Sequence, residues 1–189
     1  MSASDTGELT EQLIKYALEL GLTRAKVIKA DDIVVREEVI SVGCAGCPEY
    51  GNNLMCPPVV PPPAEFLKTL STYSKGILMQ LTAELQSDPS EVGYGEAYLQ
   101  AVRLHFAVCA VESRGRVLGF LRSTGYIAGC CRLCGACPGM GEKCRNPEKA
   151  RSSMEANGIN VIETCANVGW KLQFPVSKKV AWTGLVLLD

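Results

Sequence analysis

Five thiols lie within fifteen residues, in the segment from Cys130 to Cys144. Cys131, Cys134 and Cys137 follow a C-x2-C-x2-C spacing, which lets three thiolates turn toward one centre. Only soft sulfur ligands are offered, and such ligands favour zinc or an iron–sulfur cluster over harder metals. The segment therefore predicts a metal site.

A second group of cysteines occurs earlier in the chain. Cys44, Cys47 and Cys56 follow the spacing C-x2-C-x8-C, and Pro57 and Pro58 come directly after them. Proline fixes backbone angles and removes a competing N–H donor beside a ligand. Two groups of this kind argue against chance. The predicted metal ligands are Cys44, Cys47, Cys56, Cys131, Cys134, Cys137 and Cys144, and Cys130 and Cys165 are further candidates.

The three remaining cysteines are less suited to bind metal. Cys130 is adjacent to Cys131, and since neighbouring side chains point different ways, the spacing selects Cys131 for the metal. Cys109 falls on an apolar helical stripe, where a free cysteine behaves as a small hydrophobic residue. Cys165 is isolated, and both a core position and a ligand role remain open for it.

Seven predicted ligands do not fill a whole number of cubane clusters, each of which takes four thiolates. One arrangement is a complete cluster in the later group and a three-thiolate cluster in the earlier group, whose open iron binds water, substrate or a borrowed ligand. Another follows bacterial ferredoxins, where the last cysteine of a run, here Cys144, serves the other cluster. A four-cysteine zinc site and a disulfide framework are the alternatives. Overlapping C-x2-C-x2-C spacing favours one or two 4Fe–4S clusters over zinc.

Length and cysteine content restrict the class of protein. At 189 residues the chain is long enough for a real core, and we expect one metal-binding domain over residues 1–189. Its ten cysteines are about 5% of the residues, below the roughly 8–10% typical of disulfide-stapled secreted chains. The first five residues lack the features of a signal peptide. Reduced thiols and a cytoplasmic location are therefore expected.

Charge and hydropathy exclude two kinds of partner. No apolar run approaches the roughly 20 residues of a membrane-spanning helix, so no membrane is expected as a partner. A net charge of -1 gives no overall field that would attract nucleic acid. Several basic residues nevertheless follow the later thiols, either as a solvated face or as compensation for an anionic thiolate–metal centre. They are Arg132, Lys143, Arg145, Lys149 and Arg151.

Other common kinds of site have little support. His105 is the only histidine, which excludes zinc sites built from two cysteines and two histidines. We expect it on a helix surface or half-buried rather than acting as a catalytic base. The chain has no G-x-G-x-x-G segment after a strand and no Walker A sequence, so nothing indicates nucleotide binding.

Regular elements surround the two cysteine groups. Apolar residues at helical spacing predict helices, and short apolar runs of β-type residues predict strands. Helices are predicted at residues 9–20, 65–73, 96–121 and 147–157, and strands at 25–28, 33–35, 77–81 and 180–188. The order of elements suits an α+β fold, a single-domain sandwich of a small β-sheet and helices with the cysteines in connecting loops.

Two of these helices carry more detailed predictions. In the third, Leu99, Val102 and Phe106 share one stripe with Cys109, which predicts its buried face. In the fourth, Asn146 is an N-cap, Pro147 suits the first helical position, and Gly158 ends the helix.

The cysteine motifs together resemble a known family. The motifs are C-x2-C-x8-C-P-P, C-x2-C-x2-C-x6-C-R-x-P and S-M-E-A-x-G, within roughly residues 25–189. This combination is similar to a family of predicted metal-binding proteins of unknown function found in many anaerobic bacteria and archaea. The resemblance implies a cytoplasmic iron–sulfur or metal protein and marks the seven cysteines above as ligands. It implies no reaction.

Two functions remain open beside a structural zinc module. An electron-transfer protein needs clusters fully ligated by cysteine and a surface for a redox partner protein. An enzyme needs an open iron beside a pocket for a small-molecule substrate, with Tyr50, Asn52 or Arg132 nearby. The thiol count favours the enzyme, whereas the lack of acid–base groups near the motifs favours electron transfer.

Overall fold

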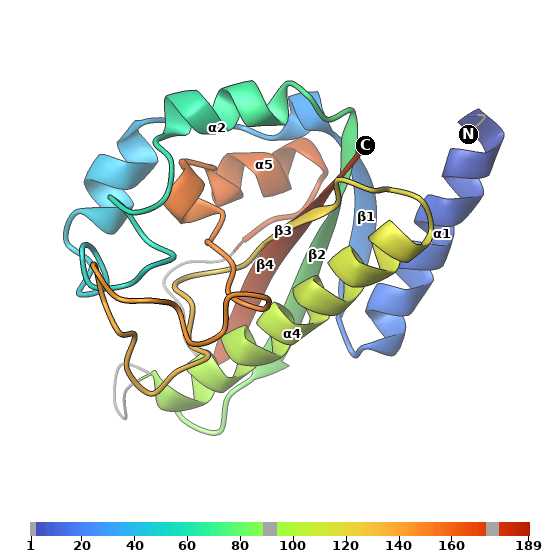
Figure 1. Cartoon of the computed structure of the whole chain (residues 1–189). Helices are drawn as coiled ribbons and strands as arrows, with labels where there is room; N and C mark the ends of the chain where they lie inside the picture. Colours follow the sequence, from blue (N-terminus) through green and yellow to red (C-terminus); the bar gives the residue numbers. More distant parts are fainter. Residues whose placement is uncertain (1–2, 89–93, 173–177) are drawn as a thin grey trace.

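The computed structural model describes residues 3–88, 94–172 and 178–189. Within these residues a four-stranded antiparallel sheet of order β1-β2-β4-β3 has helices on both faces (Figure 1). The strands are β1 Arg24–Lys29, β2 Lys75–Glu84, β3 Thr124–Tyr126 and β4 Lys179–Leu188. The helices are α1 Ala3–Glu19, α2 Pro63–Leu70, α4 Gly95–Val117 and α5 Val161–Asn167, with shorter helical turns at η1 Ala30–Asp32, η2 Val39–Cys44 and η3 Glu155–Asn157. The predicted α+β fold is confirmed.

The central strand β4 explains why helices cover both faces of the sheet. Its last residues are fully buried, and successive side chains of a strand point to opposite faces. Val186 and Leu188 pack in one core with residues of α1 and α4, whereas Leu185 and Leu187 pack in another with residues of α2 and α5. The chain therefore reads as a continuous apolar run here, because neither face of the strand meets water.

Most predicted elements are confirmed. The opening helix, the strands at 25–28, 77–81 and 180–188 and the helix after the three prolines all form. Gly21 follows the opening helix with a φ of 86°, as a helix-ending glycine does. None of the helices in the described ranges is long and apolar enough to span a bilayer.

The predicted buried face of α4 is wrong. Leu99 and Phe106 are 64% and 49% exposed, and the helix instead buries a face rich in small residues. Glycines in the sheet explain the choice, because a Cβ atom at Gly125 or Gly184 would lie 2.7 Å from the Val108 side chain. The helix approaches the strands too closely for large side chains on both partners.

The predicted strand at 33–35 is also wrong. Only Val35 pairs in β fashion, as an isolated bridge to Ile159. The backbone groups nearby bond instead to the segment around α5, with Val34 N donating to Thr164 Oγ1 and Arg36 N donating to Gly158 O. These partners are not a strand of the sheet, so no ladder forms.

The predicted helix at 147–157 does not form. Asn146 begins a single turn, in which its carbonyl accepts from Lys149 N and Ala150 N. The chain then extends so that Ile127 N donates to Ser152 O, and a short helical turn follows before Gly158, whose φ is 78°. The tertiary contacts of residues 147–157 therefore override the capping signals at Asn146 and Gly158.

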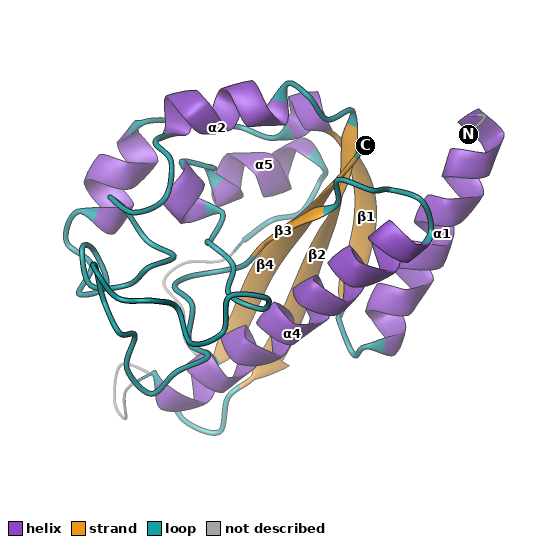
Figure 2. Cartoon of the chain, in the orientation of Figure 1, coloured by secondary structure: helices purple, strands orange, loops and turns teal. Residues whose placement is uncertain are grey.

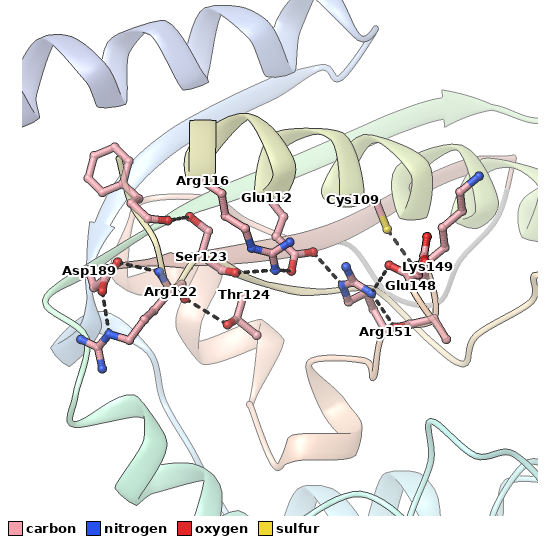
Figure 3. A network of polar contacts seen from close by, with 12 residues as sticks. Cys109, Glu112, Arg116, Arg122, Ser123, Thr124, Glu148, Lys149, Arg151 and Asp189 are labelled. Carbon is pink, nitrogen blue, oxygen red and sulfur yellow. Dashed lines mark hydrogen bonds and ion pairs between the residues drawn. The ribbon is translucent and has the colours of Figure 1, made fainter. Parts of the chain in front are cut away.

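The main tertiary contact of residues 147–157 is with a buried carboxylate on α4, that of Glu112 (Figure 3). Glu112 is 2% exposed, and Arg151 Nε donates to its Oε2 at 2.6 Å. Arg116 donates to the other carboxylate oxygen and also, at 2.9 Å, to Ser123 O just before β3. Lys149 O is held beside it, since it accepts from Cys109 Sγ at 3.4 Å and lies 2.8 Å from His105 Nε2. Helix α4 thus holds the segment that follows the later cysteines.

We expect Glu112→Ala to lower the free energy of unfolding by about 3–5 kcal/mol, because it leaves the largely buried Arg151 without its partner. Urea unfolding followed by circular dichroism measures the change. The control is Glu19→Ala, which removes an exposed Lys15–Glu19 pair and should cost under about 1 kcal/mol. Equal losses in the two variants would contradict a structural role for the Glu112 contacts.

Candidate metal centre

The two cysteine groups lie in neighbouring loops on one side of the molecule. The first cysteine loop is residues 44–57 and the second is residues 130–144, and both are largely irregular (Figure 2). Asn53 joins them, because its buried Nδ2 donates to Cys131 O at 3.0 Å and to Glu49 Oε2 at 2.9 Å. Leu54 N also donates to Cys137 Sγ at 3.4 Å. The first loop therefore supplies hydrogen-bond donors to the second.

Four cysteines of the second loop line a single small cavity. They are Cys131, Cys134, Cys137 and Cys144. Leu54 and Met55 of the first loop and Ala150 close its apolar wall. The cavity volume is ≈ 20 Å³, about that of one water-sized probe, so a four-iron cluster requires the thiols to move outward.

Three of these four thiols accept hydrogen bonds from N–H groups. Asn146 Nδ2 donates to Cys134 Sγ at 3.2 Å, and Asn146 N donates to Cys144 Sγ at 3.4 Å. Burial raises the pKa of Cys131, and the backbone amides of Leu133 and Arg151 act in the opposite direction. With the bond from Leu54 to Cys137, three of the four sulfurs accept a hydrogen bond from an N–H group. The cavity therefore has N–H donors directed at the sulfur atoms that line it.

Two cysteines of the first loop, Cys47 and Cys56, lie close enough to Cys130 to interact with it electrostatically. Burial raises the pKa of Cys56 to about 12, and among the neighbouring charges Cys130 has the largest effect, followed by Glu49, Cys47 and Cys44. Burial likewise raises the pKa of Cys130 to about 11, with a further increase from Glu49 and Cys47. Cys130 and Cys131 thus belong to different thiol groups although they are adjacent in sequence.

The other two cysteines and the histidine lie elsewhere. Cys165 is fully buried on α5, with its thiol 3.9 Å from Thr183 Oγ1 of the sheet. Cys109 packs against Lys149 O, and burial raises its pKa. His105 is 1% exposed, more buried than predicted, and burial lowers its pKa. Across the described ranges, no three Cys, His, Asp or Glu side chains converge as one metal ion requires.

The basic residues near the second loop do not act as one face. Arg132 stacks on Tyr98, 3.6 Å from the ring centroid, and its charge lowers the pKa of Cys130. Arg151 is occupied by Glu112, and Arg145 donates to Ala136 O at 3.3 Å. Charge compensation near a thiol group therefore applies to Arg132, whereas Arg145 and Arg151 support the backbone and α4.

A larger cavity borders the first cysteine loop. Its volume is ≈ 650 Å³, and apolar side chains from η2, α5 and β4 form most of its wall. Two of its lining residues lie next to a thiol: Gly43, which precedes Cys44, and Glu155, whose carbonyl lies 3.9 Å from Cys44 Sγ. Burial raises the pKa of the Glu155 carboxyl. Sequence patterns do not reveal this cavity, because its wall comes from segments far apart in the chain.

The comparisons with known proteins identify a family. No curated protein and no solved structure shows significant similarity to the chain. Residues 26–188 match a family model described as a predicted metal-binding protein (DUF2284). Since that match covers most of the chain, this protein belongs to the DUF2284 family of predicted metal-binding proteins.

Proposed function

We propose that the protein is an iron–sulfur protein that binds a 4Fe–4S cluster through Cys131, Cys134, Cys137 and Cys144. The observation that carries the proposal is that these four thiols line one cavity and that three of them accept N–H hydrogen bonds. Such bonds to sulfur tune the reduction potential of a cluster. The bound cluster supplies one-electron redox chemistry, and the chain supplies ligands, donors and an apolar wall.

The spacing of the cysteines supports a cluster over a single zinc ion, because overlapping C-x2-C-x2-C runs are typical of cubane ligands. In a zinc site all four sulfurs lie roughly 2.3 Å from one ion, whereas in a cubane each thiolate binds a different iron. The described thiols surround a cavity without converging on a point. The second loop contains no helix or strand between Cys134 and Cys144, so little regular structure opposes the outward movement that a cluster requires.

Electron transfer to a partner protein is the function that this centre supports best. A cluster with four cysteine ligands has no open coordination position for a substrate. Cys134, Cys137 and Cys144 are only half-buried, and Met140 between them is 58% exposed. An exposed apolar residue beside half-buried ligands suits a redox partner that docks on the second loop.

The large cavity favours a second candidate, an enzyme that binds a small molecule beside the first cysteine loop. A volume of ≈ 650 Å³ falls within the roughly 300–1,000 Å³ of ligand pockets. Its rim carries Arg36 and Glu163, but these two side chains bind each other at 2.7 Å. A neutral, largely apolar molecule therefore suits the cavity better than an ion.

We expect Cys134→Ser to remove most metal from the second loop, because it takes away one of four ligands and the thiol that Asn146 bonds. Cys109→Ser is the matched control, since its thiol lies against Lys149 O outside the cavity wall. The measurement is iron, acid-labile sulfide and zinc per chain on protein purified without oxygen, with visible spectra before and after dithionite.

Sulfide-free zinc in the wild-type protein would replace the iron–sulfur proposal with a structural zinc module. Equal metal loss in the Cys134 and Cys109 variants would contradict the ligand set itself.

For the enzyme candidate, we expect the neutral fluorescent probe N-phenyl-1-naphthylamine to bind the full chain, and Ala181→Trp to weaken binding at least about tenfold. Ala181 is exposed on the cavity wall, so an indole there fills the space without entering the core. Ala64→Trp on the exposed side of α2 is the control and should leave binding unchanged. Equal binding by all three proteins would rule out the cavity as the binding site.

A further inference from the structure

We infer that Cys44, Cys47, Cys56 and Cys130 form a second metal centre, separate from the first, with Cys130 as its fourth thiolate ligand. The kind of metal, a 4Fe–4S cluster, rests on the proposed function, whereas the grouping of the thiols rests on the contacts described next.

The first observation is that the adjacent residues Cys130 and Cys131 have different thiol neighbours. The Cys131 side chain lines the small cavity of the second loop together with Cys134 and Cys144. The Cys130 thiol has Cys47 and Cys56 as its neighbours instead. Gly129, with a φ of 64°, turns the chain immediately before this pair. One peptide bond therefore separates ligands that face two different groups.

The second contact is made by Glu155, which brings the start of the first loop to the same place. Its backbone carbonyl lies 3.9 Å from Cys44 Sγ, and its carboxylate accepts from Gly129 N at 3.4 Å. Cys44 and Gly129, the residue before Cys130, therefore both contact Glu155. Nothing local in the sequence joins residues 44 and 130.

The third contact is made by Asn53, which fixes the other end of the first loop. Its side chain donates to Cys131 O, and its backbone carbonyl accepts from Cys56 N at 3.0 Å. The buried Cys56 thiol is thereby held against the segment that carries Cys130. Cys47 follows Cys44 in a tight turn, with Cys47 N donating to Cys44 O at 2.9 Å.

The charges nearby support an anionic centre at this position. Arg132 follows Cys130 and Cys131 directly, and its guanidinium is fixed by stacking 3.6 Å from the Tyr98 ring centroid. Four thiolates around a four-iron cluster carry net negative charge, which a neighbouring cation stabilises.

This grouping changes the thiol count and its meaning. Eight of the ten cysteines now fall into two sets of four, which is what two cubane clusters require. No iron of the earlier set is left open, so a molecule in the large cavity would exchange electrons without binding iron. The Cys130–Cys131 peptide bond provides a direct covalent connection between the two centres.

The test combines alanine variants and measures iron and sulfide after anaerobic reconstitution with excess iron and sulfide. We expect about eight irons per chain in the wild type and about four in Cys134→Ala. The double variant Cys134→Ala, Cys130→Ala should lose most of the iron that Cys134→Ala retains. The double variant Cys56→Ala, Cys130→Ala should lose no more iron than Cys56→Ala alone. Adding Cys165→Ala to Cys134→Ala is the matched control and should change nothing, since that thiol faces Thr183.

Electron paramagnetic resonance gives a second readout in case three thiolates still retain a cluster. Mild oxidation of Cys130→Ala should then produce a three-iron cluster signal that Cys165→Ala lacks. The inference is overturned if the Cys134→Ala protein keeps its iron when Cys130 is also replaced and no three-iron signal forms.

Absence of iron and sulfide in the wild type would refute the proposed function without deciding the grouping. The same variants loaded with Co²⁺ would then decide it. Loss of the remaining ion from Cys134→Ala when Cys130→Ala is added supports the grouping, and retention of that ion contradicts it.

Discussion

The position of the second cysteine loop depends on the ion pairs that the buried Glu112 carboxylate makes with Arg116 and Arg151. A buried carboxylate is costly unless it is paired, so this side chain constrains both arginines at once. Arg151 lies seven residues after Cys144, the last residue of the loop. Gly125 makes the arrangement sterically possible, because a Cβ there would lie 3.0 Å from Glu112 Oε2. The long helix is thus the platform against which an irregular ligand-bearing loop is held.

Rigid support matters because the two loops have little regular structure of their own. Ligands on irregular loops gain order either from contacts with the scaffold or from the metal itself, and metal-binding free energy then contributes to folding. Here the scaffold contributes at identifiable points. Ile127 bonds across to the segment before η3, and Gly158 fits where any Cβ would lie 2.6 Å from the Pro63 side chain. Strands, α4 and α2 therefore fix the ends of the loops, while the residues between the ends stay adaptable to a bound group.

The sequence was informative where structure depends on neighbours in the chain. Helical and strand periodicity located α1, β2 and β4, and thiol spacing located Cys131, Cys134 and Cys137 around one cavity. It failed where partners are distant. The capping signals at Asn146 do not reveal the ion pair between Arg151 and Glu112. The apolar stripe of α4 does not reveal the glycines on the strands that it packs against. The spacing selects Cys131 and leaves Cys130 only as a further candidate, because the thiols that interact with Cys130, Cys47 and Cys56, are more than seventy residues earlier in the chain.

The side chain of Asn53 has a thermodynamic consequence for how the protein fills with metal. Its amide group contacts the backbone of both loops, with Nδ2 on Cys131 O and Oδ1 accepting from Met55 N. Ordering one loop therefore lowers the conformational entropy still to be lost by the other. Under the proposed two-centre arrangement such coupling is reciprocal, so occupancy of either loop would raise the metal affinity of the other by the same factor. Chains with one loop loaded would then be scarcer than for two independent sites.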